Sequence, residues 1–533
     1  MTLSILTDDE IRALLENLTA SELDVFLRQL QAALHEYSTG TQLSAIHQPE
    51  RTSVYSATTG ATTLFMPSVS PAGHGIKVIT LTSPSTKTEV DAAAAADAPP
   101  VIRPTGAITL FSPQGAPIGI LHASTLTAFR TALASVCLVN KRDNVRTLTV
   151  FGCGEQAYWH VRLSLLLRGS TIRHVNLINR RFSDNCRAIL PRFYTIPHGV
   201  KQREGWHECQ FGVLTPGYGE YGRLLEDHLA AADVIFCCTP STEPLFDPAI
   251  LTSSDARRKG RLIVAIGSYT PQMHEVPVEL IWQATRPHEK HHHHHFHKHV
   301  TEGGVVVVDT LDGALKEAGE LIEAGLEPTQ LVELGELAML RTMRLAEDKA
   351  ASSPALEPAA ASGSIPSLST DVSHLDLSGN SNNNINPSFS SANLSIPSDI
   401  ASTTTTDDTT TTTTTTTGSN DRPASLSSGS SRPKLGPRLL SAISTHAPKH
   451  SHHRSASQTS VATTSSSTAD NASSISKKKQ HQKDADRDHM ARWLQAGNVI
   501  YKSVGLGIMD LTVGLAVIAH AKEKGVGSHV EGF

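Results

Sequence analysis

The spacing of apolar residues divides the chain into two patterned regions, and the first runs to about residue 130. Apolar positions in the opening 40 residues recur at helical spacing, and capping-box pairs at Thr7 and Glu10 and at Thr19 and Glu22 precede them. We therefore expect the chain to open with two helices. Short β-branched runs from residue 51 to 81 predict strands joined by turns, and AITLFSPQGAPIGILHA predicts a hairpin. A helix that begins near Ser124 is expected next.

The second patterned region holds short, continuous apolar runs. RTLTVFG, HVNLIN, ADVIFCCT, RLIVAIG and GGVVVVDT are separated by helical segments and loops. Continuous runs are typical of strands buried on both faces, as in a parallel sheet covered by helices. The alternation predicts a doubly wound α/β domain of the Rossmann type, from about residue 131 to about residue 345.

Two low-complexity segments interrupt this plan. HEKHHHHHFHKH spans residues 288–299, and a stretch rich in Ser, Thr, Asn and Pro spans about 350–489. The long stretch has too little apolar surface to offset its ordering entropy, so we predict a disordered linker. Clustered imidazoles can bind transition metals, but this run lacks defined ligand spacing, so we predict a loop and assign no metal site. Globular composition returns at 490–533, and this segment is expected to pack back on the folded body.

Composition narrows the choice of partners and compartment. The formal net charge is -5 over 533 residues, which provides no basic field for nucleic acid or an acidic membrane. The six cysteines form no CxxC pair, which favours free thiols in a reducing compartment over disulfides or a zinc cluster. The N-terminus lacks a signal-peptide pattern, and no apolar run approaches ~18 residues. We expect a cytoplasmic protein.

One stretch predicts a cofactor. In RTLTVFGCGEQAYWH, a predicted strand is followed by a turn with the pattern G-x-G-x-x-A, which opens a helix. This is the setting of a dinucleotide-binding fingerprint. The first glycine allows the tight turn, the second lets a pyrophosphate approach the backbone, and the amides at the helix start would face the phosphates. The predicted cofactor-binding residues of this turn are Gly152, Cys153, Gly154, Glu155 and Gln156.

The next predicted strand bears on the choice between NADPH and NAD. It ends at Asn179, where NAD-preferring sites usually carry Asp or Glu to accept the ribose hydroxyls. Asn179 carries no charge that would repel a 2′-phosphate, and Arg180 and Arg181 could pair with one. We predict a preference for NADPH. NAD is the alternative if the two arginines only begin a solvated helix.

Nine short motifs then follow one another along the chain. They are PERTSVY, LFMPSV, GIKVITL, LTAFRTALAS, FGCGEQAYWH, TPSTEPLF, AIGSYTPQMHEV, LKEAGEL and YKSVGLGIMD. Each is weak alone, but their ordered succession resembles the ornithine cyclodeaminase/mu-crystallin family. The resemblance covers roughly residues 3–345 and 490–533 and leaves out both low-complexity segments.

The resemblance implies a domain plan and a set of site residues. A mixed α+β domain at 1–130, completed by 490–533, would bind substrate and form a homodimer, and a Rossmann domain would span 131–349. Family members act on amino and imino acids. Lys77 and Arg130 are therefore expected to hold a substrate carboxylate and to be the catalytic pair, while Arg51 completes a cationic pocket. Read alone, Lys77 or Arg130 would be interpreted as a surface charge. The resemblance also implies cofactor contacts for Thr131, Thr239 and Ser503.

One position departs from the family pattern. Cyclodeaminases carry an aspartate where AIGSYTPQMHEV places Tyr269, which is neutral at pH 7 and cannot pair with an ammonium group. The sequence is therefore closer to the mu-crystallin-like ketimine reductases, and we expect an NAD(P)H-dependent reductase of imino acids. Two alternatives stay open. One is an ornithine cyclodeaminase, with Glu275 in place of the missing aspartate, and the other is a non-catalytic NADPH-binding protein.

Overall fold

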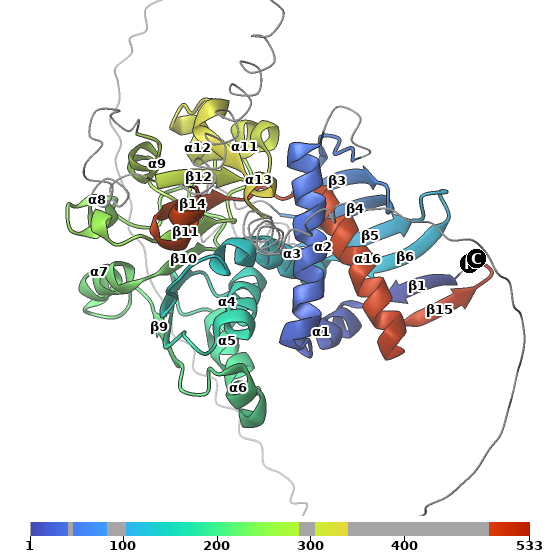
Figure 1. Ribbon diagram of the computed structural model, residues 1–533, viewed down its shortest axis with the longest axis horizontal. Coiled ribbons are helices and arrows are strands. Elements are labelled where there is room, and N and C mark those ends of the chain that lie inside the picture. Colours follow the sequence, from blue (N-terminus) through green and yellow to red (C-terminus); the bar gives the residue numbers. More distant parts are fainter. Residues whose placement is uncertain (1, 41–45, 83–102, 287–303, 339–489) are drawn as a thin grey trace, which may run out of the picture. The chain divides into compact units, whose positions relative to one another are not determined.

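The computed structural model describes residues 2–40, 46–82, 103–286, 304–338 and 490–533, and these form two sheets with helices packed on them (Figure 1). The histidine run at 288–299 and the predicted linker at 350–489 lie outside the described residues. Within the described part of the chain, no helix is long and apolar enough to cross a lipid bilayer.

The first sheet has seven strands in the order β15-β1-β6-β5-β4-β3-β2. Neighbouring strands are antiparallel except for β1 and β6. The strands are β1 (Thr2–Leu6), β2 (Thr52–Ser56), β3 (Ala61–Ser70), β4 (Gly73–Leu81), β5 (Thr105–Phe111), β6 (Pro117–His122) and β15 (Ser528–Glu531). The predicted strands and hairpin at 51–122 are confirmed.

The expectation that the chain opens with a helix is wrong, because β1 precedes both N-terminal helices. The short segment TLSIL is stabilised as a strand by its two neighbours, β6 and the far C-terminal β15. This pairing joins residues more than 500 positions apart, so local spacing could not reveal it. The two helices follow as α1 (Asp8–Glu16) and α2 (Ala20–Thr39), and both predicted capping boxes are present.

Four helices pack on this sheet or beside it. Figure 1 shows α2 and α16 (Gly507–Lys524) next to each other, and α16 packs on β3, β4 and β5. Helix α3 (Ala123–Val139) also packs on β4 and β5, and α1 packs on α3 and β6. Apolar residues of α2, including Leu23, Leu27 and Leu30, form one buried core with Leu110 and Leu121 of the sheet.

The second sheet has eight parallel strands in the order β13-β12-β14-β11-β10-β7-β8-β9. The strands are β7 (Thr147–Phe151), β8 (His174–Ile178), β9 (Gln210–Leu214), β10 (Val234–Cys237), β11 (Leu262–Ala265), β12 (Gly304–Val308), β13 (Leu331–Glu333) and β14 (Asn498–Lys502). The order reverses beside β7, where β8 lies on one side and β10 on the other. The fold is therefore α/β with a Rossmann-type doubly wound sheet, as predicted.

Helices connect the strands of this sheet. They are α4 (Glu155–Arg168), α5 (Asp184–Tyr194), α6 (His198–Glu204), α7 (Tyr221–Ala231), α8 (Ala249–Thr252), α9 (Val278–Thr285), α11 (Leu311–Glu317), α12 (Gly319–Glu323) and α13 (Leu334–Ala338). Single 3₁₀ turns lie at Ala256–Arg258 and Pro328–Gln330.

The C-terminal segment contributes to both sheets. Strand β14 inserts between β11 and β12, α16 then packs on the seven-stranded sheet, and β15 pairs with β1. The domain limits predicted at 130, 349 and 489 stay a prediction. The first of them falls inside α3, which runs unbroken from Ala123 to Val139.

Candidate active site

The predicted cofactor turn lies at the carboxyl end of β7, where the strand order reverses. Gly152 has φ 103°, and a Cβ there would lie 2.8 Å from the carbonyl oxygen of Cys238, so only glycine fits. Gly154 differs, because a Cβ there would meet no atom within 4 Å. Gly154 is also the N-cap of α4. Because it has no side chain, it does not cap the first backbone amides of the helix. The turn therefore offers open space beside amides at a helix start, which fits a phosphate.

The other residues of the turn face the protein. Cys153 is buried at 6% exposure. The Glu155 carboxylate accepts hydrogen bonds from Arg12 at 3.0 Å and from Arg192 at 2.7 Å. The side-chain oxygen of Gln156 is buried without a hydrogen-bond partner. Glu155 thus ties the turn to α1 and α5, and its contact with a cofactor stays a prediction, as do those of Cys153 and Gln156.

The predicted nucleotide-preference residues follow β8 at the same edge of the sheet. Arg180 and Arg181 are exposed, and the Asn179 side chain donates to the Arg181 carbonyl at 2.7 Å. Thr239 follows β10 at this edge as well, and its backbone amide donates to Glu275 at 2.8 Å. The structure therefore brings Asn179, both arginines and Thr239 to the edge that carries the glycine turn.

Two predicted substrate residues share one buried carboxylate. Asp510 Oδ2 lies 2.8 Å from Lys77 Nζ, and Arg130 Nε donates to Asp510 Oδ1 at 3.0 Å. Lys77, Arg130 and Asp510 are only 2%, 4% and 1% exposed, so all three charges are buried and none lies on the surface. Burial and then the neighbouring charge of Arg130 lower the pKa of Lys77 to about 8, while Asp510 raises it.

Arg51 completes a group of three cations, but it also has a carboxylate partner. Its Nε donates to one carboxylate oxygen of Glu317 at 2.6 Å, and its Nη2 donates to the other. Its Nη1 donates to the carbonyl of Val504 at 3.4 Å. Burial and the charge of Arg130 lower the pKa of Arg51 to about 10, and nearby Tyr269 acts in the opposite direction. Tyr269, at the position of the family aspartate, therefore lies near this cation. We call Arg51, Lys77 and Arg130 the cationic clamp.

The loop after β14 connects the clamp to the sheet. Gly505 has φ 83°, and a Cβ there would lie 2.9 Å from both terminal nitrogens of Arg130. Asp309 fixes this loop, because its carboxylate accepts from the Ser503 hydroxyl at 2.7 Å and from the amides of Val504 and Gly505. Ser503 therefore has a structural partner. The predicted contact residue Thr131 likewise donates its hydroxyl to the Thr127 carbonyl within α3.

A second buried polar network lies at the loop after β11, which also carries Tyr269. Glu275 is fully buried and accepts from the amides of Thr239, Gly267 and Ser268. Burial raises the pKa of Glu275 to about 7. Its carboxylate thus braces the loops after β10 and β11, which argues against the suggestion that it replaces the family aspartate. Lys502 Nζ donates to the Ser268 carbonyl at 2.6 Å and pairs with a buried glutamate of α12, Glu320, at 3.2 Å.

The sequence interpretation missed the anions of this site. Asp510 and Glu317 both lie in motifs that carry the family resemblance, YKSVGLGIMD and LKEAGEL, but nothing in their spacing relates them to cations hundreds of residues away. The available signal was chemical. Three cations assigned to one pocket require buried counter-charges, and acidic residues in otherwise apolar segments were the candidates.

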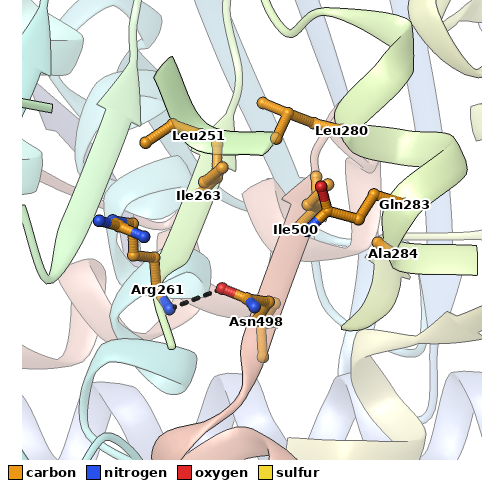
Figure 2. Close-up of a pocket in the computed structure, with 9 residues that line it drawn as sticks. Leu251, Arg261, Ile263, Leu280, Gln283, Ala284, Asn498 and Ile500 are labelled. Carbon is orange, nitrogen blue, oxygen red and sulfur yellow. Dashed lines mark hydrogen bonds between the residues drawn. The ribbon is translucent and has the colours of Figure 1, made fainter. Parts of the chain in front are cut away.

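A small pocket lies elsewhere on the same sheet. Figure 2 shows it between β11, β14 and α9, with Arg261, Asn498 and Gln283 among its lining residues. Arg261 immediately precedes β11 and Asn498 begins β14, so the pocket is at the amino ends of the strands. No predicted site residue lines it. The described residues also contain no group of three side chains suited to hold a metal ion.

Curated relatives match most of the folded chain. An uncharacterized protein of Saccharomyces cerevisiae is 29% identical over 64% of this chain and 88% of its own length. A Delta(1)-pyrroline-2-carboxylate reductase of Bacillus cereus is 28% identical over 54% and 71%. The ketimine reductase mu-crystallin of Mus musculus is 25% identical over 58% and 79%.

Solved structures share the fold at low sequence identity. The Thermococcus litoralis Delta(1)-pyrroline-2-carboxylate reductase, in complex with NADH and L-proline, is 14% identical with a TM-score of 0.51, over 99% of this chain and 100% of that one. The family model of the ornithine cyclodeaminase/mu-crystallin family matches residues 11–190, a range that holds the whole clamp and the glycine turn. These matches and the ordered motifs agree, and the chain resembles the ornithine cyclodeaminase/mu-crystallin family.

Proposed function

We propose that this protein is an NAD(P)H-dependent reductase of imino acids. The observation that carries the proposal is the cationic clamp. Its Lys77 and Arg130 share the buried Asp510, and its Arg51 and Arg130 reach the loop after β14. That loop lies at the same edge of the sheet as the glycine turn after β7. A carboxylate ligand and a dinucleotide would therefore bind at one edge, where doubly wound sheets bind their ligands.

The charges of the clamp suit a substrate with a carboxylate. Lys77 and Arg130 share the single negative charge of Asp510, which leaves this pair with an excess of one positive charge. Guanidinium and ammonium groups donate charge-assisted hydrogen bonds to a carboxylate and fix its orientation. Asp510 and Glu317 are already paired with these cations, Asp309 already accepts hydrogen bonds from the loop after β14, and Tyr269 is neutral. No described acid beside the clamp is thus left to engage a substrate ammonium group, which favours imine reduction over a cyclodeaminase reaction.

The glycine turn and α4 would hold the cofactor's phosphates, and Arg180 and Arg181 would favour NADPH over NADH by pairing with a 2′-phosphate. A bound NAD(P)H would supply the hydride. The relatives named above as pyrroline-2-carboxylate and ketimine reductases support this assignment. In the protein, Lys77 and Arg130 would hold the imino acid's carboxylate while Arg51 adds positive charge beside it.

The test is oxidation of NADPH and of NADH, in parallel, by the purified full chain with a panel of cyclic ketimine carboxylates. We expect turnover with NADPH and much less with NADH. Turnover with NADH alone would retain the reductase and overturn the NADPH preference. Ammonia release from ornithine without added reductant would establish a cyclodeaminase, and tight NADPH binding with no turnover of any substrate would establish a binding protein.

We also propose a homodimer formed through the seven-stranded sheet. Helices pack on one face of this sheet, and alternate residues on the other face stay partly exposed. Among these are Ile5 and Ile120, which are paired across β1 and β6 and are 37% and 38% exposed. An apolar sheet face of this kind fits a second copy of itself. Sedimentation equilibrium should give a dimer mass for the wild type and a monomer mass for Ile120→Arg, and a wild-type monomer would overturn the proposal.

A further inference from the structure

We propose that Asp510 is a positioning residue, which holds Lys77 and Arg130 of the clamp in the orientation that binds substrate. This inference rests on the proposed function, because it assigns a task within the same site. Asp510 would not touch the reacting atoms. It would act through Lys77 and Arg130, which would hold the substrate carboxylate.

The geometry of Asp510 places one carboxylate oxygen on each cation. Oδ2 lies 2.8 Å from Lys77 Nζ on β4, and Oδ1 accepts from Arg130 Nε on α3 at 3.0 Å. Asp510 itself lies in the first turn of α16, so three elements distant in sequence meet at one side chain. Arg130 binds Asp510 through Nε and directs its terminal nitrogens to Gly505 and, at 3.5 Å, to the Met509 sulfur. Asp510 thus fixes the orientation of the guanidinium fork.

The charges around Lys77 explain why this carboxylate matters. The charged groups that act on Lys77 are Arg130 from α3, Arg51 from the segment before β2, and Asp510 from α16. Both arginines disfavour the ammonium form, and so does burial. Of these three groups, Asp510 favours the charged ammonium form of Lys77. Because the pKa of Lys77 is about 8 with Asp510 present, loss of this charge would leave the amine largely neutral at pH 7.

A neutral Lys77 would bind a carboxylate poorly, because charge-assisted hydrogen bonds are roughly twice as strong as neutral ones. The consequence is a specific pH dependence. Activity in the wild type should fall as the pH rises through the pKa of Lys77. Without the Asp510 charge, the same fall should occur at lower pH. We call this fall the alkaline limb of the pH profile. Loss of a residue that only stabilised the fold would lower the amount of active protein and leave the pH of this limb unchanged.

The experiment compares the pH profiles of kcat/KM for the wild type, Asp510→Asn and Asp510→Glu, with a cyclic ketimine carboxylate and NADPH. In Asp510→Asn we expect the alkaline limb to move down by about one pH unit or more. At pH 7 we expect kcat/KM to fall about ten-fold or more, mainly through KM. Asp510→Glu keeps the charge, so its limb should stay near the wild-type position even if its geometry lowers the rate.

The matched control is Glu204→Gln. Glu204 is also a buried carboxylate in an ion pair, with side-chain exposures of 4% for Arg162 and 5% for Glu204, but it lies on α6 away from the clamp. It accepts from Arg162 at 2.7 and 2.9 Å and from the Trp206 indole. We expect this variant to be less stable and to keep the wild-type pH limb. An equal limb shift in Glu204→Gln would overturn the role of Asp510.

A direct titration separates this inference from the proposed function. In full-length protein with ¹³C-labelled lysine, the Lys77 Cε signal, assigned by its loss in Lys77→Met, should titrate near pH 8 in the wild type and lower in Asp510→Asn. If the wild type turns over no imino acid, the proposed function fails while this titration still reports on Asp510. If the wild type is active but neither the limb nor the titration moves in Asp510→Asn, the inference fails alone.

Discussion

The two halves of the site are built to bind negative charge by opposite means. The cationic clamp uses buried side chains from separate elements, and it holds their charge with Asp510 and Glu317. The glycine turn uses backbone amides of one short segment, and its requirement is space beside Gly154 and a positive φ at Gly152. The clamp depends on electrostatic balance and the turn on shape.

This difference determines what each half tolerates. Removing a cation from the clamp leaves a buried carboxylate without its partner, so activity and stability change together. In the turn, a single methyl group decides whether the backbone can adopt its conformation or whether a ligand can approach it. Substitutions can therefore separate the two halves by whether substrate or cofactor binding is lost.

The largest effect is expected from removing two clamp cations together. Each charge-assisted hydrogen bond contributes about 1.5–3 kcal/mol, so Lys77→Met with Arg130→Met should lower kcat/KM about a thousand-fold. NADPH binding, followed by fluorescence, should remain close to wild type. Lys141→Met is the matched control, because Lys141 is half-buried and donates to the Ala338 carbonyl away from the clamp. Equal loss of NADPH binding in the double variant would show that the two halves are not separable.

Acid should weaken the half that holds the cofactor turn. His160 on α4 is fully buried, and burial lowers its pKa from 6.5 to about 4. As the pH falls below 6.5, His160 is protonated in the unfolded chain but stays neutral in the folded one. The stability that neutral His160 provides above pH 6.5 is therefore lost as the pH falls towards 4. The loss should reach roughly 3 kcal/mol.

Denaturant titrations at pH 7 and pH 4.5 would measure this loss. His160→Gln can keep bonds to the Gln156 carbonyl and the Ser135 hydroxyl, so its stability should depend less on pH in this range. His174→Gln, at an exposed histidine, should behave as the wild type does. If His160→Gln loses as much stability in acid as the wild type, His160 is not the acid-sensitive group.

The same contrast explains what could be predicted from the sequence. The glycine turn is contiguous, so its residues, its strand and its helix follow from one stretch, and the buried runs identify most strands of the parallel sheet. Strands β1 and β15 pair across the whole chain and could not be found locally. Lys77 and Arg130 were assigned by family resemblance, while their shared partner Asp510 emerged only when β4, α3 and α16 were placed together.

Alanine substitutions at the two glycines should separate folding from cofactor binding. Gly152→Ala puts a Cβ against the Cys238 carbonyl at a φ of 103°, so it should destabilise the fold by about 1–3 kcal/mol. Gly154→Ala meets no protein atom, so its melting temperature should stay near wild type while its affinity for NADPH falls. Wild-type NADPH affinity in Gly154→Ala would mean that the cofactor does not approach this side of the turn.

The smallest effect should come from the exposed arginines after β8. Arg180→Ala with Arg181→Ala should lower the preference for NADPH over NADH about ten-fold, because solvent and salt weaken an exposed arginine–phosphate pair. The preference of the wild type should also shrink at high salt, and that of the double variant much less. Arg187→Ala is the matched control, since this exposed arginine of α5 already pairs with Asp184 and should leave the ratio unchanged. An unaltered ratio in the double variant would show that the arginines only begin a solvated helix. Specificity would then have to arise elsewhere along the carboxyl edge of the sheet.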